Sequence, residues 1–143
     1  MVVFVGEAGA MARMATAMKS QNFSVPLANW GANAYDPIFT KQGGDAVEGS
    51  LLSQTLSLYG GEDAATIPEV GLYLKWLKAA APGQKADIYS AYAWAAGRLL
   101  VQGLVAAGPK VTRPAIIAAP GQSHRFDSNA MIAAVAPAHH GAQ

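Results

Sequence analysis

Val2-Val3-Phe4-Val5, followed by the loop Gly6-Glu7-Ala8-Gly9, decides the fold class of this chain. A short continuous apolar run rich in β-branched residues is typical of a strand buried on both faces. After the loop, four apolar residues follow at the i, i+3, i+4 and i+7 spacing of one helix face, namely Met11, Met14, Ala15 and Met18. A strand, a glycine-containing loop and an amphipathic helix in this order predict the first unit of an α/β fold.

The same alternation continues to about residue 58. The pattern predicts a second strand over Val25–Trp30, with Pro26 near its start, and a short helix over Ala34–Gln42, with Pro37 in its first turn. A third strand is expected over Ser50–Leu58. Strands that alternate with helices at this spacing imply parallel pairing with right-handed crossovers. We therefore expect a three-layer α/β architecture, a parallel sheet with flanking helices.

The character of the sequence changes at the turn-rich stretch Tyr59–Asp63, which we take as the internal boundary. The remainder is predicted to be mainly helical. A first helix is expected to start with a capping box at Thr66 and Glu69 and to stop at Pro82-Gly83. A buried helix over Asp87–Ala107 should follow, and then a short helix over Ala115–Ala119 with Thr112 as N-cap. The stretch Phe126–Met131 is expected to form a turn that leads into a weak strand.

Composition excludes several classes of protein. The chain has 143 residues, enough for one domain, with 10 Lys and Arg against 9 Asp and Glu. A net charge of +1 gives no electrostatic footprint for nucleic acid or an anionic membrane, so no nucleic-acid partner is expected. Hydrophobic residues make up 52%, which argues against disorder. The absence of cysteine excludes disulfides, thiolate zinc sites and cysteine nucleophiles.

Signals for targeting and membrane insertion are missing from the sequence. The first residues lack the basic region of a signal peptide. The most apolar stretch, Ala91–Gly108, carries Arg98 near its middle, where a charge is costly in a bilayer. We interpret it as a buried helix of a soluble protein and expect no direct membrane span.

The sequence contains none of the common catalytic motifs, so we do not expect an enzyme. His139 and His140 lie in a tail without pattern, and His124 has no acidic neighbour in sequence. No metal site and no cofactor are therefore predicted.

Two loops remain as the candidate ligand site, because each follows a strand and precedes a helix. They are Gly6-Glu7-Ala8-Gly9 and Asn29-Trp30-Gly31-Ala32-Asn33, and Trp30 and Tyr35 would supply flat apolar contact with a polar group at the end. Ligands of open parallel sheets bind beyond the carboxyl ends of the strands, where helix N-termini offer free N–H groups. In the alternative interpretation, the glycines only allow tight turns and Trp30 packs in the core.

The order of segments resembles the C-terminal portion of the type 1 periplasmic solute-binding proteins, of the leucine/isoleucine/valine-binding kind. The resemblance rests on eight stretches in family order: Val2-Val3-Phe4-Val5-Gly6 with the helix to Gln21, Val25-Pro26-Leu27, Ala34-Tyr35-Asp36-Pro37, Ala46-Val47-Glu48-Gly49, Tyr89 to Trp94, Leu104 to Gly108, Thr112 to Ala119, and Phe126 to Ala130. These stretches span nearly the whole chain. The family's long N-terminal portion and its final strand are absent from the sequence.

The resemblance implies a partial two-lobed clamshell of the periplasmic-binding-protein type 1 fold that closes on a small solute. Residues 1–57 would end the second lobe, 58–63 would form a hinge crossing, 64–122 would be the helical part of the first lobe, and 123–143 would be a return segment and tail. The implied ligand-facing residues are Gly6, Glu7, Ala8, Trp30, Gly31 and Ala32. The implied partners are an amino acid or similar solute and an ABC permease, and the implied location is periplasmic or extracytoplasmic.

Three hypotheses follow for function. The first is the ligand-binding portion of an ABC-transporter substrate-binding protein that acts by hinge closure without chemistry. The second is a nucleotide- or anion-binding doubly wound domain of an enzyme, with Gly6 to Gly9 as the anion loop. The third is a fragment that binds nothing by itself, or a regulatory receptor domain with the same fold. For any of them, exposed apolar faces such as Val70, Leu74 and Leu77 would favour a homo-oligomer.

Overall fold

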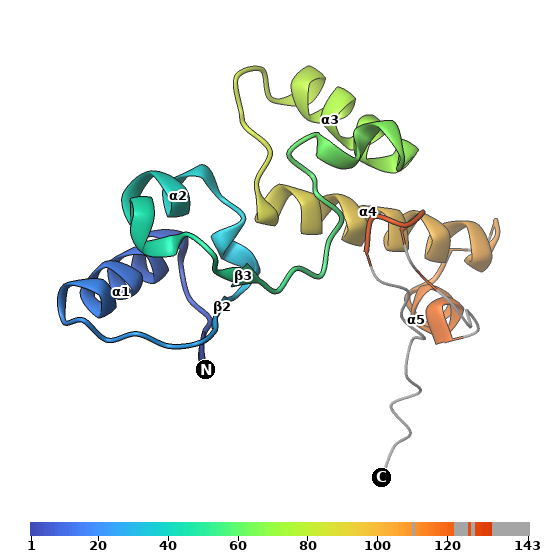
Figure 1. Cartoon of the computed structure of the whole chain (residues 1–143). Coiled ribbons are helices and arrows are strands. Elements are labelled where there is room, and N and C mark those ends of the chain that lie inside the picture. The colour runs from blue at the N-terminus through green and yellow to red at the C-terminus, as the bar shows by residue number, and fades with distance from the viewer. Residues whose placement is uncertain (110, 122–125, 127, 133–143) are drawn as a thin grey trace, which may run out of the picture. The chain divides into compact units, whose positions relative to one another are not determined.

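The computed structural model describes residues 1–109, 111–121, 126 and 128–132. This part of the chain divides into two compact units, Met1–Thr55 and a second unit that begins at Leu56. The chain is mixed α/β, with a three-stranded parallel sheet and flanking helices (Figure 1). The α/β class expected from the sequence is therefore confirmed.

The first unit contains the sheet. Its elements in chain order are β1 (Val2–Phe4), α1 (Ala8–Ser20), β2 (Ala28–Trp30), η1 (Ala32–Ala34), α2 (Pro37–Gly43), η2 (Gly44–Val47) and β3 (Leu51–Leu52). The strand order is β1-β2-β3, and both pairs are parallel. Phe4, Trp30 and Leu52 lie level with one another across the sheet. The predicted alternation of strands and helices is confirmed.

The strands are shorter than predicted. β2 begins at Ala28 rather than at Val25, since Pro26 has no N–H to offer a neighbouring strand. β3 ends at Leu52 rather than at Leu58. Beyond it, Leu56 belongs to the second unit, where it forms an antiparallel bridge with Ile132.

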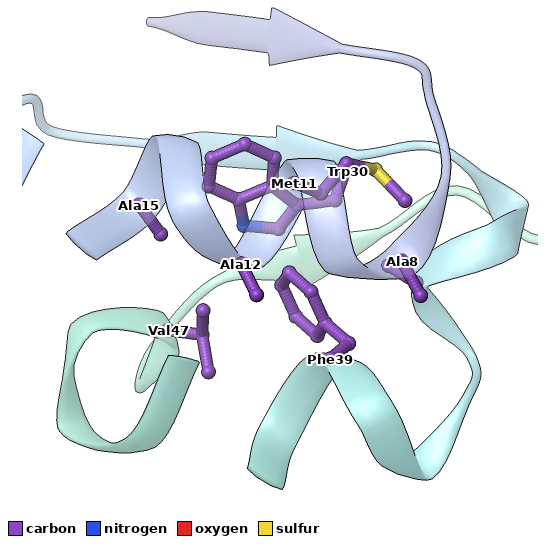
Figure 2. Packing of buried hydrophobic residues seen from close by; sticks show 8 residues of the cluster. Ala8, Met11, Ala12, Ala15, Trp30, Phe39 and Val47 are labelled. Carbon is purple, nitrogen blue, oxygen red and sulfur yellow. The ribbon is translucent and has the colours of Figure 1, made fainter. Parts of the chain in front are cut away.

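The core of the first unit lies on one face of the sheet (Figure 2). Met11 and Ala15 of α1 are buried against Trp30, as the helical spacing predicted. Phe39 of α2 packs against the Trp30 indole with ring centroids 5.8 Å apart. Met14, which the spacing placed on the same face, is exposed, so that part of the prediction is wrong.

No helix of Met1–Thr55, all of which is described, covers the other face of the sheet. Side chains alternate between the two faces along a strand. Val3 and Leu51, which lie on the face opposite Phe4 and Leu52, are 56% and 54% exposed. The first unit is therefore built of two layers rather than the three expected from the sequence.

The described part of the second unit is mainly helical. It comprises η3 (Glu62–Ala65), α3 (Pro68–Ala80), α4 (Ile88–Ala107) and α5 (Arg113–Gly121). Gly108 ends α4 with a φ of 71°, which glycine adopts without strain. The Thr112 hydroxyl accepts a hydrogen bond from Ala115 N at 3.3 Å, so the predicted cap of α5 is confirmed.

The start of α3 differs from the prediction. Pro68 occupies the first turn as expected, but the N-cap is Ile67 and no side chain caps the helix. The Thr66 hydroxyl donates instead to the Asp63 carbonyl at 3.2 Å. The predicted capping box at Thr66 and Glu69 is wrong, because both oxygens of the Glu69 carboxylate accept hydrogen bonds from other parts of the unit.

The prediction of an exposed apolar face on α3 is also wrong. Val70 is 0% exposed, and Leu74 and Leu77 are partly buried. In the described part of the second unit, the exposed large apolar side chains lie mainly on α4 instead, among them Leu100 and Val105. No helix in the described part of the chain is long and apolar enough to cross a membrane.

Candidate functional site

The structure brings the two predicted loops together at the carboxyl ends of β1 and β2. Gly31 N donates a hydrogen bond to the Phe4 carbonyl at 2.9 Å. A methyl group built on Gly31 would lie 3.0 Å from Val5 Cγ1, so the second loop can approach the first closely only because residue 31 has no side chain. Parallel strands place their carboxyl ends at one edge, and the loops meet there as expected.

The predicted site residues differ in accessibility. Glu7 is exposed and occupies the N-cap position of α1, without capping the helix through its side chain. Gly6, Ala32 and Tyr35 are partly exposed, whereas Ala8 and Gly31 are buried. The surface of the predicted site therefore consists mainly of Glu7, Tyr35 and backbone.

Trp30 does not contribute its ring to this edge. The indole is 1% exposed and lies in the core between α1 and Phe39. A tryptophan that ends a strand directly before a loop points to one face of the sheet, and here that face is the covered one. The structure agrees with the alternative interpretation, in which Trp30 is a core residue.

The start of α1 carries two polar side chains that the sequence did not single out. A methyl group built on Gly9 would lie 3.1 Å from Gln42 Oε1 and 3.4 Å from Arg13 Nη1. The absence of a side chain at position 9 thus leaves room for an amide from α2 and a guanidinium from α1 over the first turn. The free N–H groups of a helix start, together with a cation, favour an anion.

A cavity of about 400 Å³ lies elsewhere in the first unit, at the amino end of β2 and the carboxyl end of α1. Lys19 and Asp45 form an ion pair at this cavity. The hydrogen bond from Lys19 holds the pKa of the Asp45 carboxyl below its ordinary value. The indole N–H of Trp30, which also lines this cavity, has no hydrogen-bond partner within the described structure.

Sequence reasoning missed a buried carboxylate in the second unit. Glu69 is 5% exposed. Its Oε1 accepts from Trp94 Nε1 at 2.7 Å and lies 3.1 Å from Arg98 Nε, and its Oε2 accepts from Asn129 Nδ2 at 2.9 Å. The signal was present in the sequence, because Trp94 and Arg98 are four residues apart and share one helix face. Nothing local linked them to Glu69.

Among the described residues, no group of three or more His, Asp or Glu side chains is placed to hold a metal ion. The three histidines lie outside the described residues.

Comparison with protein-family models, with curated proteins and with solved structures found no match for this chain.

Proposed function

We propose that this chain is the ligand-binding portion of an ABC-transporter substrate-binding protein for amino acids or similar small polar solutes. It would trap its ligand by hinge closure without chemistry, in an extracytoplasmic compartment, and deliver it to a permease. The observation that carries the proposal is the paired loop edge, where Arg13 and Gln42 lie near Gly9 in the first turn of α1 and the exposed Glu7 occupies the N-cap position of the same helix.

The chemistry of this edge matches a zwitterion. A ligand carboxylate would bind the N–H groups at the start of α1 and the Arg13 guanidinium, since charge-assisted hydrogen bonds of this kind are the stronger ones. A ligand ammonium would meet the carboxylate of Glu7. Tyr35, on the neighbouring loop, would contribute flat apolar contact with a hydroxyl group at its end.

A nucleotide- or phosphate-binding role is the second candidate, because the same helix start and the same guanidinium suit a phosphate. Glu7 separates the two candidates. Its negative charge attracts the ammonium of an amino acid and repels the extra charge of a phosphate.

The test is a calorimetric titration of the whole chain with a panel of amino acids and nucleotides. We expect an amino acid to bind and Arg13→Gln to weaken it by about tenfold or more, from the loss of a charged hydrogen bond. Gly9→Ala should also weaken binding, because a methyl group there would lie 3.1 Å from Gln42 Oε1 and push this amide away from the first turn. Binding of nucleotides alone, or of nothing in the panel, would contradict the proposal.

Two matched controls separate binding from stability. Gly97 is a glycine within α4 with open space around its Cα, so Gly97→Ala should stabilise the helix by up to about 1 kcal/mol and leave binding unchanged. Arg113→Gln removes an exposed arginine at the start of α5 and should have no effect on affinity. If Gly9→Ala behaves like Gly97→Ala, the start of α1 is not the site.

A further inference from the structure

The second unit holds a cavity of about 550 Å³, and none of its lining residues comes from the loops of the sheet. It lies between the later half of α4 and the turn around Ser128. Its polar lining includes Arg98, Ser128 and Asn129, and its apolar lining includes Val101, Val105 and Phe126. All of these residues belong to the unit that begins at Leu56.

Ser128 is the first observation that points to a ligand. The residue is 3% exposed, lines the cavity, and its hydroxyl has no hydrogen-bond partner within the described structure. Buried polar groups are nearly always hydrogen-bonded, and leaving a hydroxyl unpaired is unfavourable. A ligand with an acceptor atom in the cavity would satisfy it.

The backbone around Ser128 is fixed in an uncommon conformation. Ser128, Asn129 and Ala130 have φ values of 48°, 55° and 68°, in the left-handed region that non-glycine residues rarely adopt. Surrounding contacts hold this turn, because Ser57 Oγ donates to the Ala130 carbonyl at 2.7 Å and Asn129 Nδ2 donates to Glu69. Such strained turns persist where the surroundings determine them, and they are common at ligand sites.

Arg98 is the second observation. Its Nε contacts the buried Glu69 carboxylate, which fixes the position of the guanidinium. A guanidinium has five N–H donors, and this contact uses one of them. The remaining fork of N–H groups matches the geometry of a second carboxylate.

We propose that this cavity binds a small carboxylic acid with an aliphatic body. The ligand carboxylate accepts hydrogen bonds from the Arg98 guanidinium and the Ser128 hydroxyl, and its aliphatic chain packs against Val101, Val105 and Phe126. This site lies in a different unit from the loop edge of β1 and β2, and it stands whether or not that edge binds an amino acid.

The test is an NMR titration of the whole chain with sodium 3-methylbutanoate and, separately, with the uncharged 3-methylbutanamide. We expect the acid to give saturable shifts at the Ser128 amide and the Arg98 Nε–H, and to bind at least tenfold more tightly than the amide. Equal affinity for acid and amide, shifts confined to Gly9 and Arg13, or no saturable shift would each overturn the proposal.

Variants assign the contacts. Ser128→Ala should weaken binding of the acid by about tenfold, because it removes one hydrogen bond to a charged group. Ser20→Ala, at an exposed serine that bonds within the end of α1, should leave the affinity unchanged. The Trp94 indole N–H signal reports whether the Glu69 contacts survive in each variant. An unchanged affinity in a folded Ser128→Ala protein would also overturn the proposal.

Discussion

The carboxylate of Glu69 joins three parts of the second unit. It lies at the start of α3, accepts a hydrogen bond from Trp94 and forms an ion pair with Arg98, both of α4, and accepts a hydrogen bond from Asn129 in the left-handed turn. A buried carboxylate is tolerated because its oxygens are paired with donors and one of these donors is a cation. An uncharged amide at this position has only one acceptor oxygen, so at least one of these buried donors would lose its partner, and an unpaired buried donor is costly.

Glu69→Gln is therefore expected to destabilise the second unit by roughly 2–4 kcal/mol, because the amide keeps the shape but presents an N–H₂ group to neighbouring donors. Urea unfolding followed by the Trp94 indole signal would measure the change. Glu48→Gln, at an exposed glutamate of the first unit, is the matched control and should change stability by less than about 0.5 kcal/mol. Equal effects of the two substitutions would contradict the importance given to the buried carboxylate.

At the scale of elements, α4 begins with a complete capping box. The Asp87 carboxylate accepts from Ser90 N at 2.7 Å, and Asp87 N donates to Ser90 Oγ at 3.2 Å. Ser90 Oγ also lies 2.7 Å from the Tyr73 hydroxyl, which connects the cap to α3. The backbone N–H of Ser90, more than any other contact, holds the pKa of Asp87 below its ordinary value.

The stability from this cap should depend on pH. A carboxyl whose pKa is lowered on folding stabilises the protein above its unfolded pKa of about 3.9, and this contribution is lost as the pH falls through the lower folded value. Asp87→Ala should cost about 1 kcal/mol at pH 7, and this difference from the unmodified chain should shrink below about pH 4. Thermal melts of both proteins from pH 7 to pH 2.5 would measure it.

Asp87→Asn separates the cap from its charge. Asparagine caps helices about as well as aspartate, so Asp87→Asn should lower the free energy of unfolding at pH 7 by only a few tenths of a kcal/mol. Its cap contribution should not titrate. A pH dependence in Asp87→Asn equal to that of the unmodified chain would show that other groups govern the acid response.

Which elements the sequence predicts depends on how local their signals are. The sequence predicts the end of α4 at Gly108 and the start of α5 after Thr112 closely, because caps and stop residues act within one turn. The sequence predicts a capping box at Thr66 and Glu69, whereas the box lies at Asp87 and Ser90, because both pairs have suitable residues at the same spacing. Only the burial of Glu69 against α4 and Asn129 decides between them.

The candidate sites show the same limit. The meeting of the two loops followed from parallel pairing, which the strand and helix order predicts. The burial of Trp30 depends on which sheet face the helices cover, and the approach of Gln42 to Gly9 joins residues of two helices. Ser128 and Arg98 line one cavity although thirty positions separate them. The spacing of apolar residues along the sequence does not show which face of the sheet is covered or which distant residues meet.

At the scale of the whole molecule, each unit has its own buried side chains. Trp30 and Phe39 are buried in the first unit, and Val70 and Tyr73 in the second. The sequence placed its internal boundary at Tyr59–Asp63, whereas the compact units divide between Thr55 and Leu56. Self-association remains a prediction, and it would use the exposed side chains of α4 rather than Val70.

Two compact units with separate cores should unfold with separate midpoints. The indole N–H signals of Trp30 and Trp94 report on the first and second unit, because one ring is buried against α1 and the other donates to Glu69. In a urea titration of the whole chain followed by NMR, Glu69→Gln should lower the midpoint of the Trp94 signal and leave that of Trp30 unchanged. A common midpoint that shifts for both signals would mean that the chain unfolds as one cooperative unit, and the boundary at Leu56 would then have no energetic meaning.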